Sequence, residues 1–167
     1  MIRTFNTLLV TMFGLGKIKF MPGTFGSLAT TIFLFYLFHI LKVSSAMILV
    51  GLIIVFIYSF YAVSMHTKDN KDKDPSEIVI DEFLGQSIPI YLYEISHGTS
   101  KENGEAIIYY ALFFVLFRYF DIMKPFPVSY FDKNFKNSFG VIMDDIVAGL
   151  YVVLTLVCFM IVKSYVL

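Results

Sequence analysis

The stretch AMILVGLIIVFIYSFYAV, residues 46–63, decides the fold class of this chain. It carries no charged residue, and it approaches the roughly 20 apolar residues with which a helix crosses the hydrocarbon core of a bilayer. The chain as a whole is also more apolar than a soluble domain, since 57% of its 167 residues are hydrophobic, against about 45–50% in soluble domains. The stretch therefore predicts a transmembrane α-helix in an integral membrane protein.

Four further apolar runs have about the length of a membrane-spanning helix. They cover residues 25–41, 78–93, 105–120 and 146–162. Because these runs are continuous, they do not fit the alternating segments of about 10 residues that build a membrane β-barrel. We therefore expect an all-α, polytopic membrane helical bundle of about five spanning helices, preceded by an N-terminal amphipathic helix. Residues 1–167 are expected to form a single membrane-embedded domain.

The distribution of basic residues predicts how the bundle is oriented. With five spans, residues 1–27, 64–78 and 121–145 lie on one side of the membrane. Together with Arg118 at the adjoining helix end, they hold all but three of the Lys and Arg residues. The exceptions are Lys42, Lys101 and Lys163. Because cytoplasmic loops carry an excess of Lys and Arg, this side is predicted to be cytoplasmic. The formal net charge of zero gives no reason to expect a nucleic-acid partner.

Acidic residues gather at the predicted helix ends on this same side. Charged groups at membrane depth cost several kcal/mol, so they are rare and usually functional or paired. A spacing of i, i+3, i+6 places three charges at the end of the fourth span along roughly one helix face. The full set is Asp81 and Glu82 at the start of the third span, Arg118, Asp121 and Lys124 at the end of the fourth, and Asp144 and Asp145 at the start of the fifth. Their convergence predicts a common site.

The carboxylates of this set favour a bound cation. Several carboxylates close together repel one another unless a cation neutralises them, and oxygen ligands without a Cys or His cluster favour a hard ion such as Mg²⁺. Asp121 would either complete the metal shell or act as a general base. The expected metal ligands are Asp81, Glu82, Asp144 and Asp145, which together with Asp121 form the expected catalytic set.

Basic and small residues beside the carboxylates favour a phosphate ligand. An Arg fork and a Lys point charge can both hold anionic oxygen atoms. The motif MPGTFGS, residues 21–27, opens the first span, where hydroxyls and backbone N–H groups at a helix N-terminus would favour phosphate. Metal, basic side chains and amides together suit phosphoryl transfer or phosphate-ester hydrolysis. The expected substrate-binding residues are Thr24, Gly26, Ser27, Arg118 and Lys124.

Each of these features also has a purely structural interpretation. Ser27 could be only a helix N-cap, and Asp121 could simply pair with a basic residue one turn away. The two acidic pairs could be ordinary first-turn residues that the helix dipole favours. Glu94 lies on the opposite side of the predicted bundle and is expected to be solvated. These structural interpretations explain why the charged residues converge on one membrane face less well than a common functional site does.

Four motifs occur in order along the chain. They are GLGKIKFMPGTFGSL (14–28), IVIDEFLG (78–85), FRYFDIMKPFPV (117–128) and MDDIVAG (143–149). In this order and spacing they resemble the phosphatidylglycerophosphatase A family of bacterial membrane enzymes.

The resemblance implies Mg²⁺-dependent hydrolysis of phosphatidylglycerophosphate to phosphatidylglycerol and inorganic phosphate, with the lipid substrate held at the cytoplasmic face of the bacterial inner membrane. The residues carried over are Asp81, Glu82, Arg118, Asp121, Lys124, Asp144 and Asp145, with Pro22, Gly23, Thr24, Gly26 and Ser27 in the first loop.

Other membrane proteins with clustered aspartates fit the sequence less well. A CDP-alcohol phosphotransferase needs a D-x-x-D-G-x-x-A-R pattern, and a type-2 phosphatidic acid phosphatase needs a Ser-Gly-His context, and the sequence contains neither. A small divalent-cation transporter, or a phosphatase of a different lipid phosphate, stays as an alternative. The sequence does not separate a metal-activated water from an aspartyl-phosphate route, and it does not fix the oligomeric state.

Overall fold

The computed structural model describes residues 2–68, 75–97 and 103–166, and this part of the chain is all-α, as expected. Short 3-10 and π-helical turns, Leu15–Lys17 and Tyr36–Ile40, flank the second helix. The seven α-helices are α1 (Ile2–Val10), α2 (Pro22–Phe35), α3 (Ser45–Thr67), α4 (Ile80–His97), α5 (Asn103–Met123), α6 (Val128–Asn134) and α7 (Ser138–Val166).

Four helical segments are long and apolar enough to cross a membrane: Pro22–Ile40, Ser45–Thr67, Gly104–Met123 and Ser138–Val162. They correspond to four of the five spans expected from the sequence. Helix α4 does not belong to this group, because it carries three acidic residues in 18 positions. The count of five spans therefore stays a prediction.

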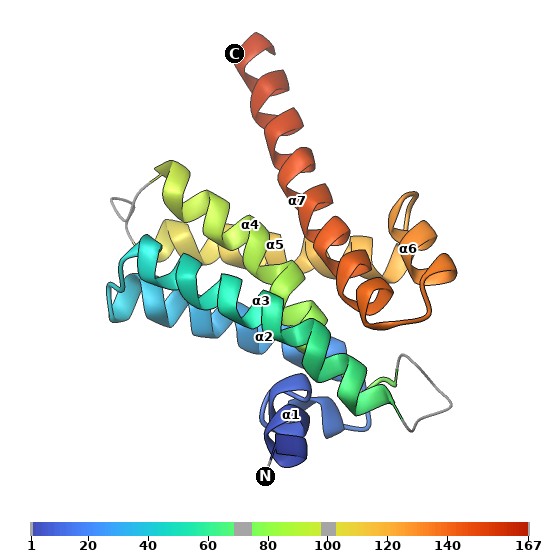
Figure 1. The fold of residues 1–167 in the computed structure, drawn as a ribbon. Coiled ribbons are helices and arrows are strands. Elements are labelled where there is room, and N and C mark those ends of the chain that lie inside the picture. Colours follow the sequence, from blue (N-terminus) through green and yellow to red (C-terminus); the bar gives the residue numbers. More distant parts are fainter. Residues whose placement is uncertain (1, 69–74, 98–102, 167) are drawn as a thin grey trace.

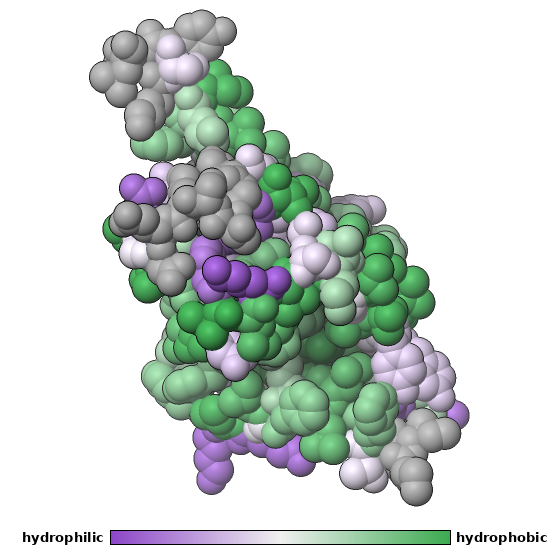
Figure 2. Space-filling model, turned by 90° about the vertical axis from the view of Figure 1, so that its left-hand side faces the viewer, coloured by the Kyte–Doolittle hydropathy of each residue, from purple (hydrophilic) through white to green (hydrophobic). Residues whose placement is uncertain are grey.

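The long helices pack as a bundle, and the two short helices α1 and α6 pack against it. Helices α2, α3, α4 and α5 run alongside one another, while α7 packs on α4 and α5 and then projects away from them (Figure 1). Helix α1 packs on α3, and α6 packs on α7. Figure 2 shows apolar residues over the middle of one face, with hydrophilic residues at its lower edge and in its upper part. Large apolar side chains such as Ile54 of α3, Val115 of α5 and Leu154 of α7 are exposed, which suits contact with lipid.

Two glycines let α4 and α7 approach to backbone contact. A Cβ atom on Gly149 would collide with the carbonyl oxygen of Gly85, and a Cβ atom on Gly85 would lie 2.5 Å from the carbonyl oxygen of Asp145 and 2.7 Å from the Phe117 ring. Small residues at helix crossings allow this close approach in membranes. The crossing places the acidic stretch of α7 beside the start of α4.

Two expectations about the segment 121–145 are wrong. The segment contains a helix, α6, where the sequence predicted only a connection between two spans. Helix α7 begins at Ser138 and has no acidic residue in its first turn, so Asp144 and Asp145 lie further along it. Their interpretation as first-turn residues therefore fails, whereas Asp81 and Glu82 do lie in the first turn of α4.

A buried hydrogen-bonded group of His39, Glu94 and Tyr110 lies near the end of α4 that is away from Asp81 and Glu82. The Nε2 atom of His39 lies 3.0 Å from Oε1 of Glu94, and the hydroxyl of Tyr110 donates to the same oxygen at 2.9 Å. Glu94 is buried, so the expectation that it is solvated is wrong. A carboxylate is tolerated in the interior when it is hydrogen-bonded in this way.

Candidate active site

Three carboxylates from two helices meet at the start of α4. Asp81 and Glu82 extend from its first turn, and Asp145 faces them from α7. One oxygen from each lies within 4.8 Å of the others, and Asp81 and Asp145 are buried. Buried carboxylates this close repel unless a cation neutralises them, and an all-oxygen ligand set suits a hard divalent ion. The residues therefore fit a metal such as Mg²⁺.

An arginine from α5 lies against this cluster. Nη1 of Arg118 is 3.9 Å from Oε1 of Glu82 and 2.5 Å from Oδ2 of Asp121. Gly23, in the first turn of α2, makes room for both side chains, because a Cβ atom there would collide with the Glu82 carboxylate and lie 3.2 Å from Nη1 of Arg118. The guanidinium is thus held by α2, α4 and its own helix. Asp121 does pair with a basic residue one turn away, as its structural interpretation expected.

The ammonium of Lys124 is held by two carboxylates. Its Nζ donates to Oδ1 of Asp132 at 2.7 Å and to Oδ2 of Asp144 at 2.8 Å. Burial lowers the pKa of Lys124, but these hydrogen bonds outweigh it and raise the pKa above its ordinary value. The hydrogen bond from Lys124 likewise lowers the pKa of Asp132. Among the described residues, Asp144 therefore faces Lys124 rather than completing the three-carboxylate cluster as a fourth member.

Asp132 is a site residue that the sequence analysis missed. It lies on α6, between two predicted spans, and it belongs to none of the four motifs. The available signal was the pair of prolines after Lys124, Pro125 and Pro127. Prolines directly after a helix end it and turn the chain, which here returns an acid eight positions later to the same lysine.

The first motif forms a helix start rather than an open turn. Met21 is the N-cap residue, and its carbonyl accepts from the N–H groups of Thr24 at 3.0 Å and Phe25 at 3.3 Å. Ser27 lies inside α2, so its interpretation as an N-cap is wrong. Its hydroxyl donates to the Gly23 carbonyl at 2.8 Å and accepts from Nη1 of Arg118 at 3.4 Å. A Cβ atom on Gly26 would meet Val79, so this glycine serves helix packing.

Several buried polar atoms around the cluster have no hydrogen-bond partner within the described part of the chain. They include Oγ1 of Thr24, Oε2 of Glu82 and Nε of Arg118. Both amide atoms of Gln86, one helical turn beyond Glu82, are in the same state. Unsatisfied buried polar atoms are costly and rare in native structures. Their concentration beside three carboxylates indicates a place for a polar ligand.

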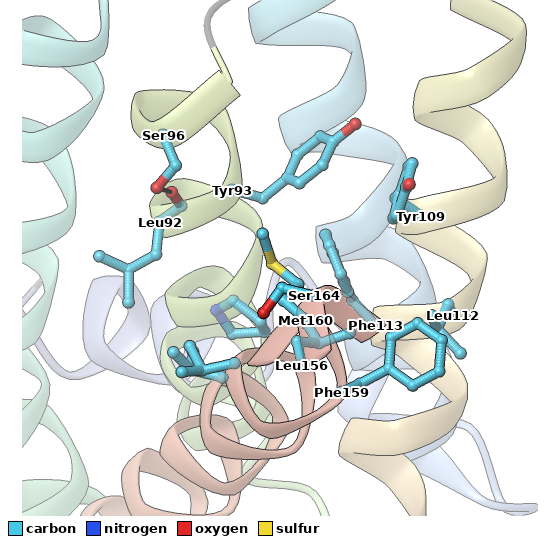
Figure 3. Close-up of a pocket in the computed structure, with 13 residues that line it drawn as sticks. Leu92, Tyr93, Ser96, Tyr109, Leu112, Phe113, Leu156, Phe159, Met160 and Ser164 are labelled. Carbon is cyan, nitrogen blue, oxygen red and sulfur yellow. Dashed lines mark hydrogen bonds between the residues drawn. The ribbon is translucent and has the colours of Figure 1, made fainter. Parts of the chain in front are cut away.

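A mostly apolar cavity lies elsewhere in the bundle. It has a volume of about 560 Å³ and is bordered by α4, α5 and α7, with residues such as Leu92, Phe113 and Leu156 on its wall (Figure 3). The described residues that line it include no charged side chain. A mostly apolar wall without a charged side chain suits hydrocarbon better than a phosphate group, so the charged cluster is the better candidate for the chemistry.

Comparison with known proteins shows which family the chain resembles. The family model of phosphatidylglycerophosphatase A matches residues 8–160. A phosphatidylglycerophosphatase A from Haemophilus influenzae is 38% identical over 88% of this chain and 83% of its own length. The Escherichia coli protein of the same name is 34% identical over 85% of this chain and 76% of its own length.

Another relative carries a different name. A putative phosphatidylinositol-3-phosphatase from Bacteroides thetaiotaomicron is 33% identical over 86% of this chain and 86% of its own length. No solved structure matches the chain at a comparable level of significance. Because the family model covers residues 8–160 and the two phosphatidylglycerophosphatases A are 38% and 34% identical over most of the chain, the chain belongs to the phosphatidylglycerophosphatase A family of lipid phosphatases.

Proposed function

We propose that this protein is a Mg²⁺-dependent phosphatase that hydrolyses phosphatidylglycerophosphate to phosphatidylglycerol and inorganic phosphate. The observation that carries the proposal is the group of three carboxylates within 4.8 Å of one another, with an arginine and unsatisfied polar atoms beside it. Membership of the family supports the choice of substrate.

Asp81, Glu82 and Asp145 are the residues that would hold the metal. When bound there, Mg²⁺ supplies Lewis-acid polarisation of the phosphate ester and favours a nucleophile at neutral pH. Oε2 of Glu82 has no hydrogen-bond partner within the described ranges, which leaves an acceptor for the ion or for a water molecule. Burial of the cluster strengthens these interactions because it lowers the local dielectric constant.

Arg118 is the residue that would neutralise the phosphate oxygens. Its Nη1 is held by Asp121 and Ser27, whereas its Nε has no partner among the described residues. A guanidinium fixed in this way is ready to donate to an oxygen that gains charge in the transition state. The geometry of Asp121 favours orienting Arg118 over abstracting a proton. The Thr24 hydroxyl, for which the described part of the chain provides no partner, offers a further donor.

The position of the cluster explains how a lipid would reach it. The charged residues lie at the ends of α4 and α5 and near the start of α2, outside the apolar middle of the bundle. A lipid could therefore present its headgroup here while its acyl chains stay in the bilayer. The excess of Lys and Arg on this side favours the cytoplasmic face.

Phosphate release from a defined lipid tests the proposal. Purified protein in detergent is incubated with phosphatidylglycerophosphate and Mg²⁺, and separately with EDTA in place of the metal. We expect release only with the metal. Absence of release from folded protein with any divalent ion would overturn the proposal.

A different lipid phosphate is the second candidate substrate. The observation behind it is the Bacteroides thetaiotaomicron relative, which is named as a putative phosphatidylinositol-3-phosphatase. The ratio of kcat/KM values for phosphatidylglycerophosphate and phosphatidylinositol 3-phosphate decides between the two. A ratio well above one supports the first candidate, and a ratio well below one supports the second.

A further inference from the structure

Lys124 connects three helices through one ammonium group. It follows directly on α5, and its two hydrogen bonds go to Asp132 on α6 and Asp144 on α7. Two carboxylates at 2.7 and 2.8 Å more than balance its single positive charge. An ammonium compensated in this way attracts a phosphate dianion weakly, because the carboxylates repel it. Arg118 also has two carboxylates nearby, Glu82 and Asp121, but it differs from Lys124 in that its Nε has no partner among the described residues.

The hydrogen bonds continue from Asp144 to a residue of the metal cluster. Oδ2 of Asp144 accepts from Lys124, and its Oδ1 accepts from the backbone N–H of Asp145 at 3.0 Å. Both oxygens of Asp144 are thus engaged, one by each neighbour. The side chain of Asp144 is 8% exposed, whereas those of Lys124 and Asp132 are 29% and 25% exposed. The series runs from the protein surface to the buried cluster.

Asp132 begins this series from a firmly packed position. Val128, in the first turn of α6, is fully buried in the core. The Tyr151 hydroxyl of α7 donates to the carbonyl of Phe126 just before α6 at 2.5 Å. A Cβ atom on Gly140 would collide with the carbonyl oxygen of Phe135, which follows α6. Both ends of α6 are therefore tied to α7, and Asp132 is presented on a rigid support.

We propose that Asp132, Lys124 and Asp144 form a positioning series that fixes Asp145 for metal binding, with Lys124 holding Asp144 in place instead of contacting the substrate phosphate. The inference rests on the proposed function only in taking Asp145 as a metal ligand. Side chains that orient a ligand from behind commonly change metal affinity or activity by about 10–100-fold when they are removed.

Metal binding without substrate tests this series. The dissociation constant of Mn²⁺, used as a paramagnetic substitute for Mg²⁺, is measured by electron paramagnetic resonance for wild type, Asp132→Asn, Lys124→Gln and the double variant. We expect each single change to raise it by about 10–100-fold. The double variant should be no worse than Lys124→Gln alone, because both residues act through the same series. Asp132→Glu, which keeps the carboxylate, should recover most of the affinity.

A matched control and a second constant separate this role from others. Lys133→Gln removes an exposed charge from the neighbouring position of α6 and should leave the Mn²⁺ constant unchanged. The inhibition constant of inorganic phosphate, measured at saturating metal, should also stay unchanged in Asp132→Asn and Lys124→Gln. If instead that constant rises in Lys124→Gln while Mn²⁺ binding is unaffected, Lys124 is a phosphate ligand and the proposal is wrong.

Two further outcomes are decisive. An unchanged Mn²⁺ constant in Asp132→Asn removes Asp132 from the series. Asp132→Asn preserves side-chain size and the Lys124–Asp144 pair, so it carries the test alone if Lys124→Gln does not fold. If wild type binds Mn²⁺ through Asp145 but releases no phosphate from any lipid, the proposed function fails. The Mn²⁺ dissociation constants of the variants then still decide whether the positioning series exists.

Discussion

At the scale of single residues, the site depends on how each charge is held. Arg118, in α5, and Lys124, directly after it, have the same sign, and the sequence assigned both to phosphate. In the structure, Nη1 of Arg118 contacts Asp121 and Ser27 while its Nε has no partner among the described residues. Lys124 is instead enclosed by two carboxylates. The sequence could not separate these roles, because one of those carboxylates, Asp132, belongs to no motif.

Arg118→Lys tests the role of the guanidinium. Lysine keeps the charge but lacks the planar fork that reaches Asp121, Ser27 and a phosphate at once. We expect kcat/KM to fall by about 10²–10³-fold, as for loss of one preorganised donor at a developing charge. The inhibition constant of inorganic phosphate should rise as well. A variant with the activity and the phosphate constant of wild type would show that Arg118 does not contact the phosphate. Lys19→Arg, at an exposed position, serves as a control.

At the scale of elements, apolar runs predicted where the long helices lie but not how they meet. Each of the four runs without internal acids corresponds to a helix, α2, α3, α5 or α7. The short helix α6 and the early start of α7 carry too little apolar periodicity to be recognised. The α4–α7 crossing depends on Gly85 and Gly149, and nothing in a single sequence shows which glycines face each other.

Gly85→Ala tests whether this crossing builds the metal cluster. The new Cβ atom would collide with the Asp145 backbone and the Phe117 ring, so α4 and α7 must separate and draw Asp145 away from Asp81 and Glu82. We expect loss of Mn²⁺ binding and of phosphate release in a protein that still has its helices by circular dichroism.

Gly51→Ala on α3 is the matched control for this change. A Cβ atom on Gly51 has open space around it, so the change should be neutral or should stabilise α3 by up to about 1 kcal/mol. Full Mn²⁺ binding in Gly85→Ala would mean that the close crossing is not required for the cluster.

At the scale of the whole molecule, the meeting of helix ends favours a fifth crossing. Glu82 at the start of α4 lies near Arg118 towards the end of α5. If α4 did not cross the membrane, these two ends would lie on opposite sides of it. Helix α4 has 18 residues, or about 27 Å at 1.5 Å per residue, which is close to the thickness of the hydrocarbon core. The sequence predicted this crossing. The three acidic residues of α4 exclude this helix from the candidate spans that are recognised by composition.

Cysteine labelling in intact bacterial cells tests both the crossing and the orientation. The sequence has one cysteine, Cys158, which is first changed to alanine. Lys42→Cys and Lys133→Cys then each introduce one exposed thiol. With five spans, a membrane-impermeant maleimide should label position 42 and reach position 133 only after permeabilisation. Labelling of both from outside would indicate four spans, and the reverse pattern would indicate the opposite orientation.

The central claim is that the three-carboxylate cluster hydrolyses a lipid phosphate with a metal. Its most direct test compares Mg²⁺-dependent phosphate release from phosphatidylglycerophosphate by wild type, Asp145→Asn and Glu105→Gln. Glu105 is an exposed acid in the first turn of α5, the end of that helix away from Arg118. We predict that Asp145→Asn folds but releases no phosphate above background at any Mg²⁺ concentration, while Glu105→Gln matches wild type. Wild-type release by Asp145→Asn would contradict the account.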